Sequence, residues 1–363
     1  MPRLPNAVDF WRGIALISIF VNHIPGIFYD RFTHRAVSIS DSAELFVFLA
    51  GWSLSYVIGR PERPTPMSQI IFRLGGRAVT LYAAHMMIVM IAIATLAAMS
   101  ELFENPLLLE WHNAAAVFYR PVETHIGIAL LSHQLGYFDI LPLYVALMLT
   151  APLLAIIDRY VPWMLLPASL ALYFVSLVVP LTIPAWPVEG QWYFNPLCWQ
   201  LIFVLGLVFA RDTGVGGWAR RNIVAIRWVA LPIVILSMIF VLTGGTWIDP
   251  TTVPSPKLLF INGKTFATPI RVIQFLALVA VMSIVYPYIA RALPKIVEFP
   301  SMLGRNSLEV FCAASVLSLV SQIVRYALPD GIVLDTLLFV GGVALMGLVA
   351  WLTEWRDRVV RKG

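Results

Sequence analysis

Long apolar stretches recur along the whole chain and leave little room for a soluble fold. A helix needs about 20 apolar residues to cross the hydrocarbon core of a bilayer. Of the 363 residues, 60% are hydrophobic and only 12% are charged, whereas soluble domains carry about 25% charged residues. We therefore predict an all-α polytopic membrane protein, a single domain over residues 1–363, with about ten transmembrane helices. The predicted spans lie near 9–28, 43–58, 74–98, 137–157, 163–181, 196–210, 224–243, 269–290, 302–320 and 333–353.

Basic residues are distributed unevenly between the predicted loops. Ten spans place both termini on one side, and most of the 25 Lys and Arg residues fall on that side. Because cytoplasmic loops carry the excess of Lys and Arg, we expect both termini in the cytoplasm. The net charge of +5 therefore reflects topology rather than binding of nucleic acid. The outer loops, near 29–42, 99–136, 182–195 and 244–268, are longer, so a bulky polar partner would meet the chain there.

The first predicted span, which begins "DFWRGIALISIFVNHIP", carries two ionisable side chains on one face. Arg12 and His23 are eleven residues apart, which is close to three helical turns and about 16 Å of rise. Pro25 has no N–H and weakens the helix beside His23. Ionisable groups inside a membrane mark functional sites. The competing interpretations are an arginine that anchors to lipid phosphate and a histidine that bonds a neighbouring helix.

Five blocks of sequence, in order along nearly the whole chain, carry a family resemblance. They are "DFWRGIALISIFVNHIPG", "SDSAELFVFLAGWSLSYVIG", "YFDILPLYVALM", "WYFNPLCWQLIFVLG" and "LGRNSLEVFCAASVLSL". An Arg, ten intervening residues and a His in the first of ten spans is typical of the acyltransferase-3 type membrane acyltransferases. The blocks resemble the OpgC branch of that family. This resemblance implies a bacterial inner-membrane enzyme that moves succinyl groups from succinyl-CoA to osmoregulated periplasmic glucans.

The resemblance also assigns roles to individual residues. His23 matches the family's essential histidine and Arg12 its arginine. Because histidine titrates near neutral pH, His23 suits the base that takes the proton of a glucan hydroxyl. A covalent acyl-histidine is the competing route. Arg12 would hold the anionic part of coenzyme A by charge-assisted hydrogen bonds, and Arg305 is a second candidate for a phosphate contact.

Three carboxylates begin predicted spans at the outer side. Asp41 and Glu44 open the second span, so one of them could orient the imidazole of His23, as a carboxylate does in a Ser-His-Asp triad. The alternative interpretation is a helix cap, with Ser40 or Asp41 as N-cap and Glu44 in the first helical turn. Asp139 opens the fourth span within one of the family blocks, and we count it as a further catalytic candidate.

The implied partners are cytoplasmic acyl-CoA, a periplasmic glucan and the bilayer, with the glucan-synthesis machinery as a further candidate. Succinyl-CoA would be a donor substrate, and no permanently bound cofactor is expected. No metal is expected either, because the spacing of the outer histidines His112, His125 and His133 matches no metal site. The outer aromatics could stack on sugar rings, although a membrane-interface belt explains them equally. They are Trp186, Trp192, Tyr193 and Trp247.

Three other functions are compatible with the pattern. A transporter for a glycan or lipid would also place polar residues inside the membrane, but it would not depend on acyl-CoA. An acyltransferase of the same fold could use another donor or acceptor. Arg31, His34 and Arg35 could read the distal carboxylate of a succinyl group or serve as interface anchors. A scaffold for a glucan synthase would leave His23 dispensable.

Overall fold

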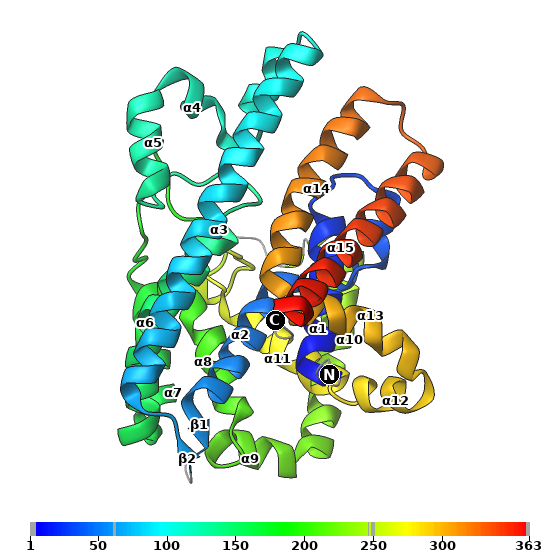
Figure 1. Cartoon of the computed structure of the whole chain (residues 1–363). Helices are drawn as coiled ribbons and strands as arrows, with labels where there is room; N and C mark the ends of the chain where they lie inside the picture. The colour runs from blue at the N-terminus through cyan, green and yellow to red at the C-terminus, as the bar shows by residue number, and fades with distance from the viewer. Residues whose placement is uncertain (1–4, 61–62, 246, 248–250, 361–363) are drawn as a thin grey trace.

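The computed structural model describes residues 5–60, 63–245, 247 and 251–360, and its regular structure there is almost entirely helical (Figure 1). The α-helices are α1 (Ala7–Asn22), α2 (Ser42–Ile58), α3 (Met67–Leu102), α4 (Ala115–Tyr119), α5 (Pro121–Ala129), α6 (Ile140–Tyr160), α7 (Pro162–Val178), α8 (Pro196–Ala210), α9 (Gly214–Arg221), α10 (Ile223–Leu242), α11 (Pro269–Met282), α12 (Val285–Ala292), α13 (Pro294–Arg305), α14 (Ser307–Ala327) and α15 (Ile332–Val360). Short 3-10 helices are η1 (Phe28–Phe32), η2 (His34–Ala36), η3 (Pro106–Asn113) and η4 (Lys257–Leu259), and β1 (Gly59–Arg60) pairs with β2 (Arg63–Pro64).

The helical membrane class agrees with the prediction, but the helices are less uniform than ten spans of equal length. Within the described ranges, six helices are long and apolar enough to cross a bilayer: α3, α6, α10, the α11–α12 pair, α14 and α15. The α8 and α9 pair, bent by 66°, would make a seventh. Helices α1, α2 and α7 are apolar but have only 16 or 17 residues.

Local sequence signals set the end of the short helix α1 and the start of the short helix α2. Helix α1 ends at Asn22, with His23 as its C-cap, two residues before Pro25. Helix α2 begins at Ser42, directly after its N-cap Asp41. A proline cannot donate to the helical ladder, and an N-cap carboxylate satisfies the free N–H groups of a helix start. These local signals place the end of α1 and the start of α2 inside the protein rather than at its surface.

Several predicted boundaries require correction. The ninth predicted span, 302–320, joins parts of two helices, because α13 ends at Arg305 and α14 begins only at Ser307. The eighth, 269–290, is supported, because α11 and α12 together form one stretch, Pro269–Ala292, that is long and apolar enough to cross a bilayer. The stretch 99–136, predicted as an outer loop, contains η3, α4 and α5. Short apolar helices cannot be separated from loops or longer spans by hydropathy alone.

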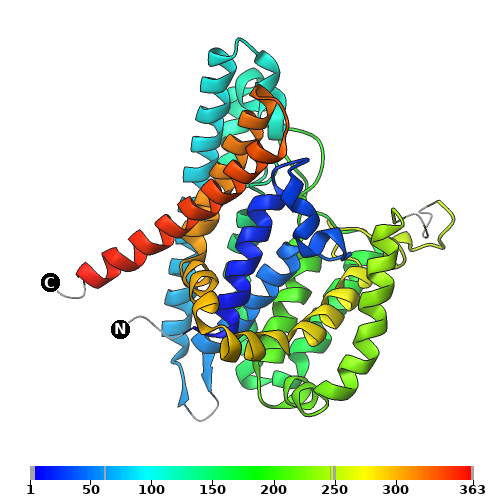
Figure 2. The same cartoon turned by 90° about the vertical axis from the view of Figure 1, so that its right-hand side faces the viewer.

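Glycines allow the central helices to approach closely. A Cβ added at Gly13 of α1 would collide with the carbonyl of Pro300 in α13, and one at Gly51 of α2 with the carbonyl of Phe203 in α8. Small residues at such crossings are typical of helix association in membranes. Figure 2 shows the result: α1 lies inside the bundle, with α14 and α15 on one side and α10 and α11 on the other.

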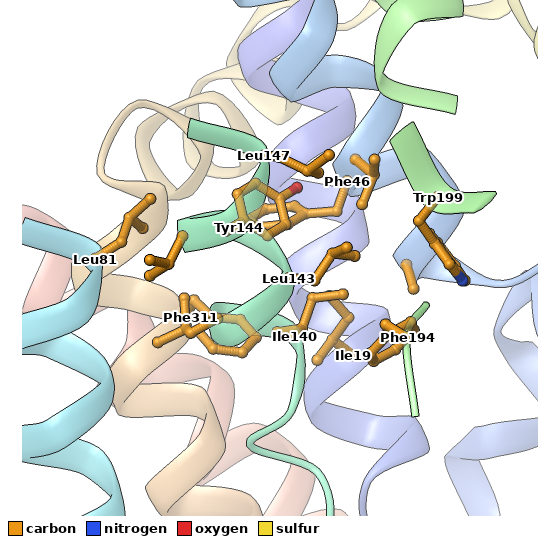
Figure 3. Packing of buried hydrophobic residues seen from close by; sticks show 14 of the residues in the cluster. Ile19, Phe46, Leu81, Ile140, Leu143, Tyr144, Leu147, Phe194, Trp199 and Phe311 are labelled. Atoms are coloured by element: carbon orange, nitrogen blue, oxygen red, sulfur yellow. The ribbon is translucent and has the colours of Figure 1, made fainter. Parts of the chain in front are cut away.

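The core around α1 is closely packed (Figure 3). The ring of Phe46 lies 5.5 Å from that of Tyr144 and 6.1 Å from that of Phe311, measured between centroids. Leu16 and Ile19 are buried on α1. At about 100° per residue, both lie on the α1 face that carries Arg12 and His23, between these two residues. Apolar side chains therefore fill the interior along the line from Arg12 to His23.

A candidate active site between two pockets

His23 stands at the end of α1 with its imidazole free of hydrogen bonds. Neither ring nitrogen has a partner among the described residues, and Nδ1 is buried. The ring instead stacks on Tyr137, with 4.5 Å between centroids and 27° between planes. The backbone carbonyl of His23 accepts a hydrogen bond of 2.6 Å from Gln322 Nε2 on α14. The side chain is thus positioned by stacking, while its polar atoms stay available.

The segments that hold His23 in place have unusual backbone geometry. Tyr137 has a φ of 67° and His112 a φ of 57°, values in the left-handed region that non-glycine residues rarely occupy. The N–H of Gly136 donates to the carbonyl of His112 at 2.9 Å, and His112 Nε2 donates to Gln322 Oε1 at 2.8 Å. Strained backbone of this kind clusters at functional sites, and here it connects the outer segment to His23.

Asp41 and Glu44 form the capping box that the sequence indicates. The Asp41 side chain accepts from the N–H of Ala43 at 2.9 Å, and Glu44 Oε2 accepts from the N–H of Asp41 at 3.0 Å. Neither carboxylate bonds the imidazole of His23 within the described part of the chain. The cap and the ion pairs described next occupy these two groups.

Lys264 and Arg271 pair with these carboxylates, and neither was singled out from the sequence. Lys264 Nζ lies 2.5 Å from Asp41 Oδ2. Arg271 Nε donates to Glu44 Oε1 at 2.7 Å, and both of these side chains are buried, with Glu44 fully enclosed. Arg271 had a recognisable signal, because it is an arginine inside the apolar run "PIRVIQFLALV". Lys264, in the connection before α11, had none.

Lys264 also brings positive charge to His23. The charged or titratable groups close enough to His23 to interact electrostatically are Lys264, Asp41, His112 and Arg35. Burial lowers the pKa of Lys264, but the Asp41 and Glu44 carboxylates raise it, and the net result lies above its usual value. Lys264 is therefore an ammonium ion at neutral pH.

Asp139 and Arg305 have different surroundings from those expected. Asp139 precedes α6 but its side chain makes no capping hydrogen bond, and it interacts electrostatically with Lys264, which places it near the same charge cluster. Arg305 is held in an ion pair. Its Nη2 lies 2.7 Å from Glu354 Oε1 on α15, and Arg305 does not line the inner pocket described next.

The inner pocket surrounds Arg12 at the other end of α1. Arg12 Nη2 donates to the carbonyl of Leu49 at 2.8 Å and to Ser53 Oγ at 2.6 Å. The cavity has a volume of about 360 Å³, and Arg73 and Arg77 of α3 also line it. None of its described lining residues is an aspartate or glutamate. A cavity with three guanidinium groups and no carboxylate favours an anionic ligand.

The outer pocket lies beside His23 and has a different character. Its volume is about 600 Å³. Tyr137 and Gln322, which contact His23, form part of its wall, and Arg325 and Asp330 on its rim are paired at 2.9 Å. His23 therefore lies between a cationic pocket and a pocket whose rim charges neutralise each other. This arrangement suits a base that acts on two ligands arriving from opposite ends of α1.

The comparisons with known proteins identify the family of the chain. The family described as OpgC protein matches residues 4–358. Comparison with curated proteins gives no match. Among the described residues, no group of three or more His, Cys, Asp or Glu side chains is placed to hold a metal ion.

Proposed function

The chain belongs to the OpgC family, and from this membership we propose that it is a membrane O-acyltransferase of the bacterial inner membrane. It moves a succinyl group from cytoplasmic succinyl-CoA to hydroxyl groups of osmoregulated periplasmic glucans. The observation that carries the proposal is the position of His23, whose unpartnered imidazole lies between the two pockets. The termini face the cytoplasm, so Arg12 lies at the donor side and His23 toward the acceptor side.

The inner pocket supports the assignment of the donor. Coenzyme A carries several phosphate charges, and Arg12, Arg73 and Arg77 offer guanidinium groups that bind phosphate through paired hydrogen bonds. Arg73 and Arg77 are four residues apart on α3 and therefore share one face of that helix. The gap of about 16 Å between Arg12 and His23 matches the reach of a pantetheine arm, and the side chains that fill this interior at rest, among them Leu16 and Ile19, would have to move aside as the arm enters.

Acyl transfer requires His23 first to accept a proton and then to donate it. As the glucan hydroxyl oxygen attacks the thioester carbon, His23 takes the hydroxyl proton. The tetrahedral intermediate then collapses, the carbon–sulfur bond breaks, and the imidazolium returns the proton to the departing thiolate. The products are the succinyl ester and free coenzyme A. Lys264, which the Asp41 carboxylate holds as an ammonium ion, stabilises the negative charge that develops on the carbonyl oxygen.

The two carboxylates act through the cations that they hold. Asp41 fixes the Lys264 ammonium, and Glu44 fixes Arg271, while their capping box sets the start of α2. The stacked ring of Tyr137 orients the imidazole. Asp41 and Glu44 are thus positioning residues, and the base is His23 alone.

The test uses cells that lack this gene and carry either the wild-type chain, His23→Ala or His125→Ala. His125 is an outer histidine that hydrogen-bonds the carbonyl of Pro121 within its own helix, so it serves as the matched control. Mass spectrometry of the periplasmic glucans is expected to show added succinyl esters with the wild type and the control only. An added group of another mass would change the donor. Unmodified glucans with the wild type would contradict the proposal.

A further inference from the structure

The outer pocket has the construction of a sugar site. Trp111 and Tyr326 form two of its walls, with ring centroids 5.6 Å apart and planes at 88°. More than half of the Tyr326 side chain is exposed. An aromatic face that remains open to solvent in a pocket of mixed polar and apolar lining offers an apolar surface to a ligand that is otherwise hydrophilic. Pyranose rings have this dual character, because their C–H groups lie on one face and their hydroxyls around the edge.

The polar groups of the same pocket match hydroxyls better than phosphates or carboxylates. The Arg325 guanidinium is paired with Asp330 at 2.9 Å and also with Asp335, so its charge is neutralised. His112 Nε2 donates to Gln322 Oε1, so His112 Nδ1 can accept from a hydroxyl, while the amide of Gln322 keeps a second N–H to donate and a second lone pair to accept. The inner pocket, by contrast, has three arginines and no carboxylate among its described lining residues. The outer pocket therefore suits a neutral ligand, and the inner pocket an anionic one.

Two residues that line the pocket contact the proposed base. Gln322 donates to the backbone carbonyl of His23, and Tyr137 stacks on its imidazole. Pro25, two residues after His23, completes that side of the pocket. A sugar that stacks in the corner formed by the perpendicular rings of Trp111 and Tyr326 would therefore have its edge directed to the residues that surround His23.

We propose that the outer pocket is the acceptor subsite, in which Trp111 and Tyr326 stack on a glucosyl unit while the polar groups around Gln322 bind its hydroxyls. This proposal rests on the proposed function, because it names the substrate class that reaches His23 from outside. It assigns glucan stacking to two aromatic residues other than the four outer aromatics that sequence analysis indicates.

Binding is the first readout, because it requires no acyl transfer. Purified full-length protein in lipid nanodiscs is titrated with a neutral glucose oligosaccharide in the absence of acyl-CoA, by calorimetry. We expect Trp111→Ala and Tyr326→Ala to weaken binding by about tenfold or more, as for anchor aromatics elsewhere. Trp111→Phe keeps a stacking face and should retain most of the affinity. Trp247→Ala removes an exposed outer tryptophan that packs on Phe240 and should bind like the wild type.

The second readout separates the two proposals. In acyl transfer from succinyl-CoA to purified glucan, Trp111→Ala should raise the KM for glucan by about tenfold, with the KM for succinyl-CoA unchanged. If the wild-type protein binds the oligosaccharide but transfers no acyl group, the subsite proposal is supported and the proposed enzyme function is overturned. Wild-type activity with equal glucan affinity in Trp111→Ala would overturn the subsite alone, as would a wild type that binds no oligosaccharide.

Discussion

Gln322 Nε2 lies 2.6 Å from the backbone carbonyl oxygen of His23, although 299 residues separate the two in sequence. The same amide accepts a hydrogen bond from His112 Nε2 through its Oε1. One side chain on α14 thus ties the end of α1 to the outer segment. Its two bonds fix the orientation of the amide, so that the nitrogen faces His23.

Replacing Gln322 by Glu tests this anchor. A carboxylate has nearly the same shape but cannot donate to the carbonyl of His23, and a lost buried hydrogen bond costs about 1–3 kcal/mol. We expect kcat for acyl transfer to fall by about tenfold or more, while the KM for succinyl-CoA stays unchanged. Steady-state kinetics with both substrates varied checks this, and a selective rise in the KM for succinyl-CoA would contradict it.

Alanine substitutions in the inner pocket test the donor assignment. A hydrogen bond to a charged group contributes about 1.5–3 kcal/mol, so Arg73→Ala or Arg77→Ala should raise the KM for succinyl-CoA by about tenfold or more. The KM for glucan should not change. Arg356→Ala is the control, because Arg356 is an exposed arginine of α15 that pairs only with its neighbour Asp357 among the described residues. Equal effects of all three variants would argue against a phosphate site.

The Glu44–Arg271 pair provides a prediction about stability. Both side chains are buried, and removal of one partner from a buried ion pair destabilises a protein by about 3–5 kcal/mol. Glu44→Gln should therefore lower the melting temperature in detergent, measured by tryptophan fluorescence. Asp41→Asn should have a smaller effect, because Asp41 is less enclosed. If Arg271→Gln restores stability to Glu44→Gln, the two effects are coupled; simple addition would show that the pair is not the cause.

His112 provides a prediction about pH. Burial lowers the pKa of His112 below its usual value of 6.5, although the hydrogen bond to Gln322 raises it in part. The unfolded chain therefore binds this proton more readily, so the stability that His112 contributes is present above about pH 6.5 and is lost as the pH falls toward the lowered value. His112→Gln should make the melting temperature fall less between about pH 7 and about pH 5. An unchanged slope would show that His112 does not contribute.

The sequence predicts the local features of the site well. The shared face of Arg12 and His23 follows from helical periodicity, and the capping box of Asp41 and Glu44 follows from the residue types at a helix start. The family resemblance is confirmed over 4–358. The partners of these residues were not predictable, because Lys264 lies 223 residues from Asp41 and hydropathy does not say which helices meet. Trp111 falls in a stretch that hydropathy marks only as a loop.

The packing between the two pockets has a consequence for the cell. Leu16 and Ile19 are buried between Arg12 and His23, and the inner pocket, which the rings of Phe46, Tyr144 and Phe311 line, shares no described lining residue with the outer pocket. A reaction that joins a cytoplasmic donor to a periplasmic acceptor would otherwise need a standing aqueous passage. Close-packed apolar side chains exclude ions as the surrounding hydrocarbon does. At rest, this packing would keep ions from passing through the protein between the two pockets.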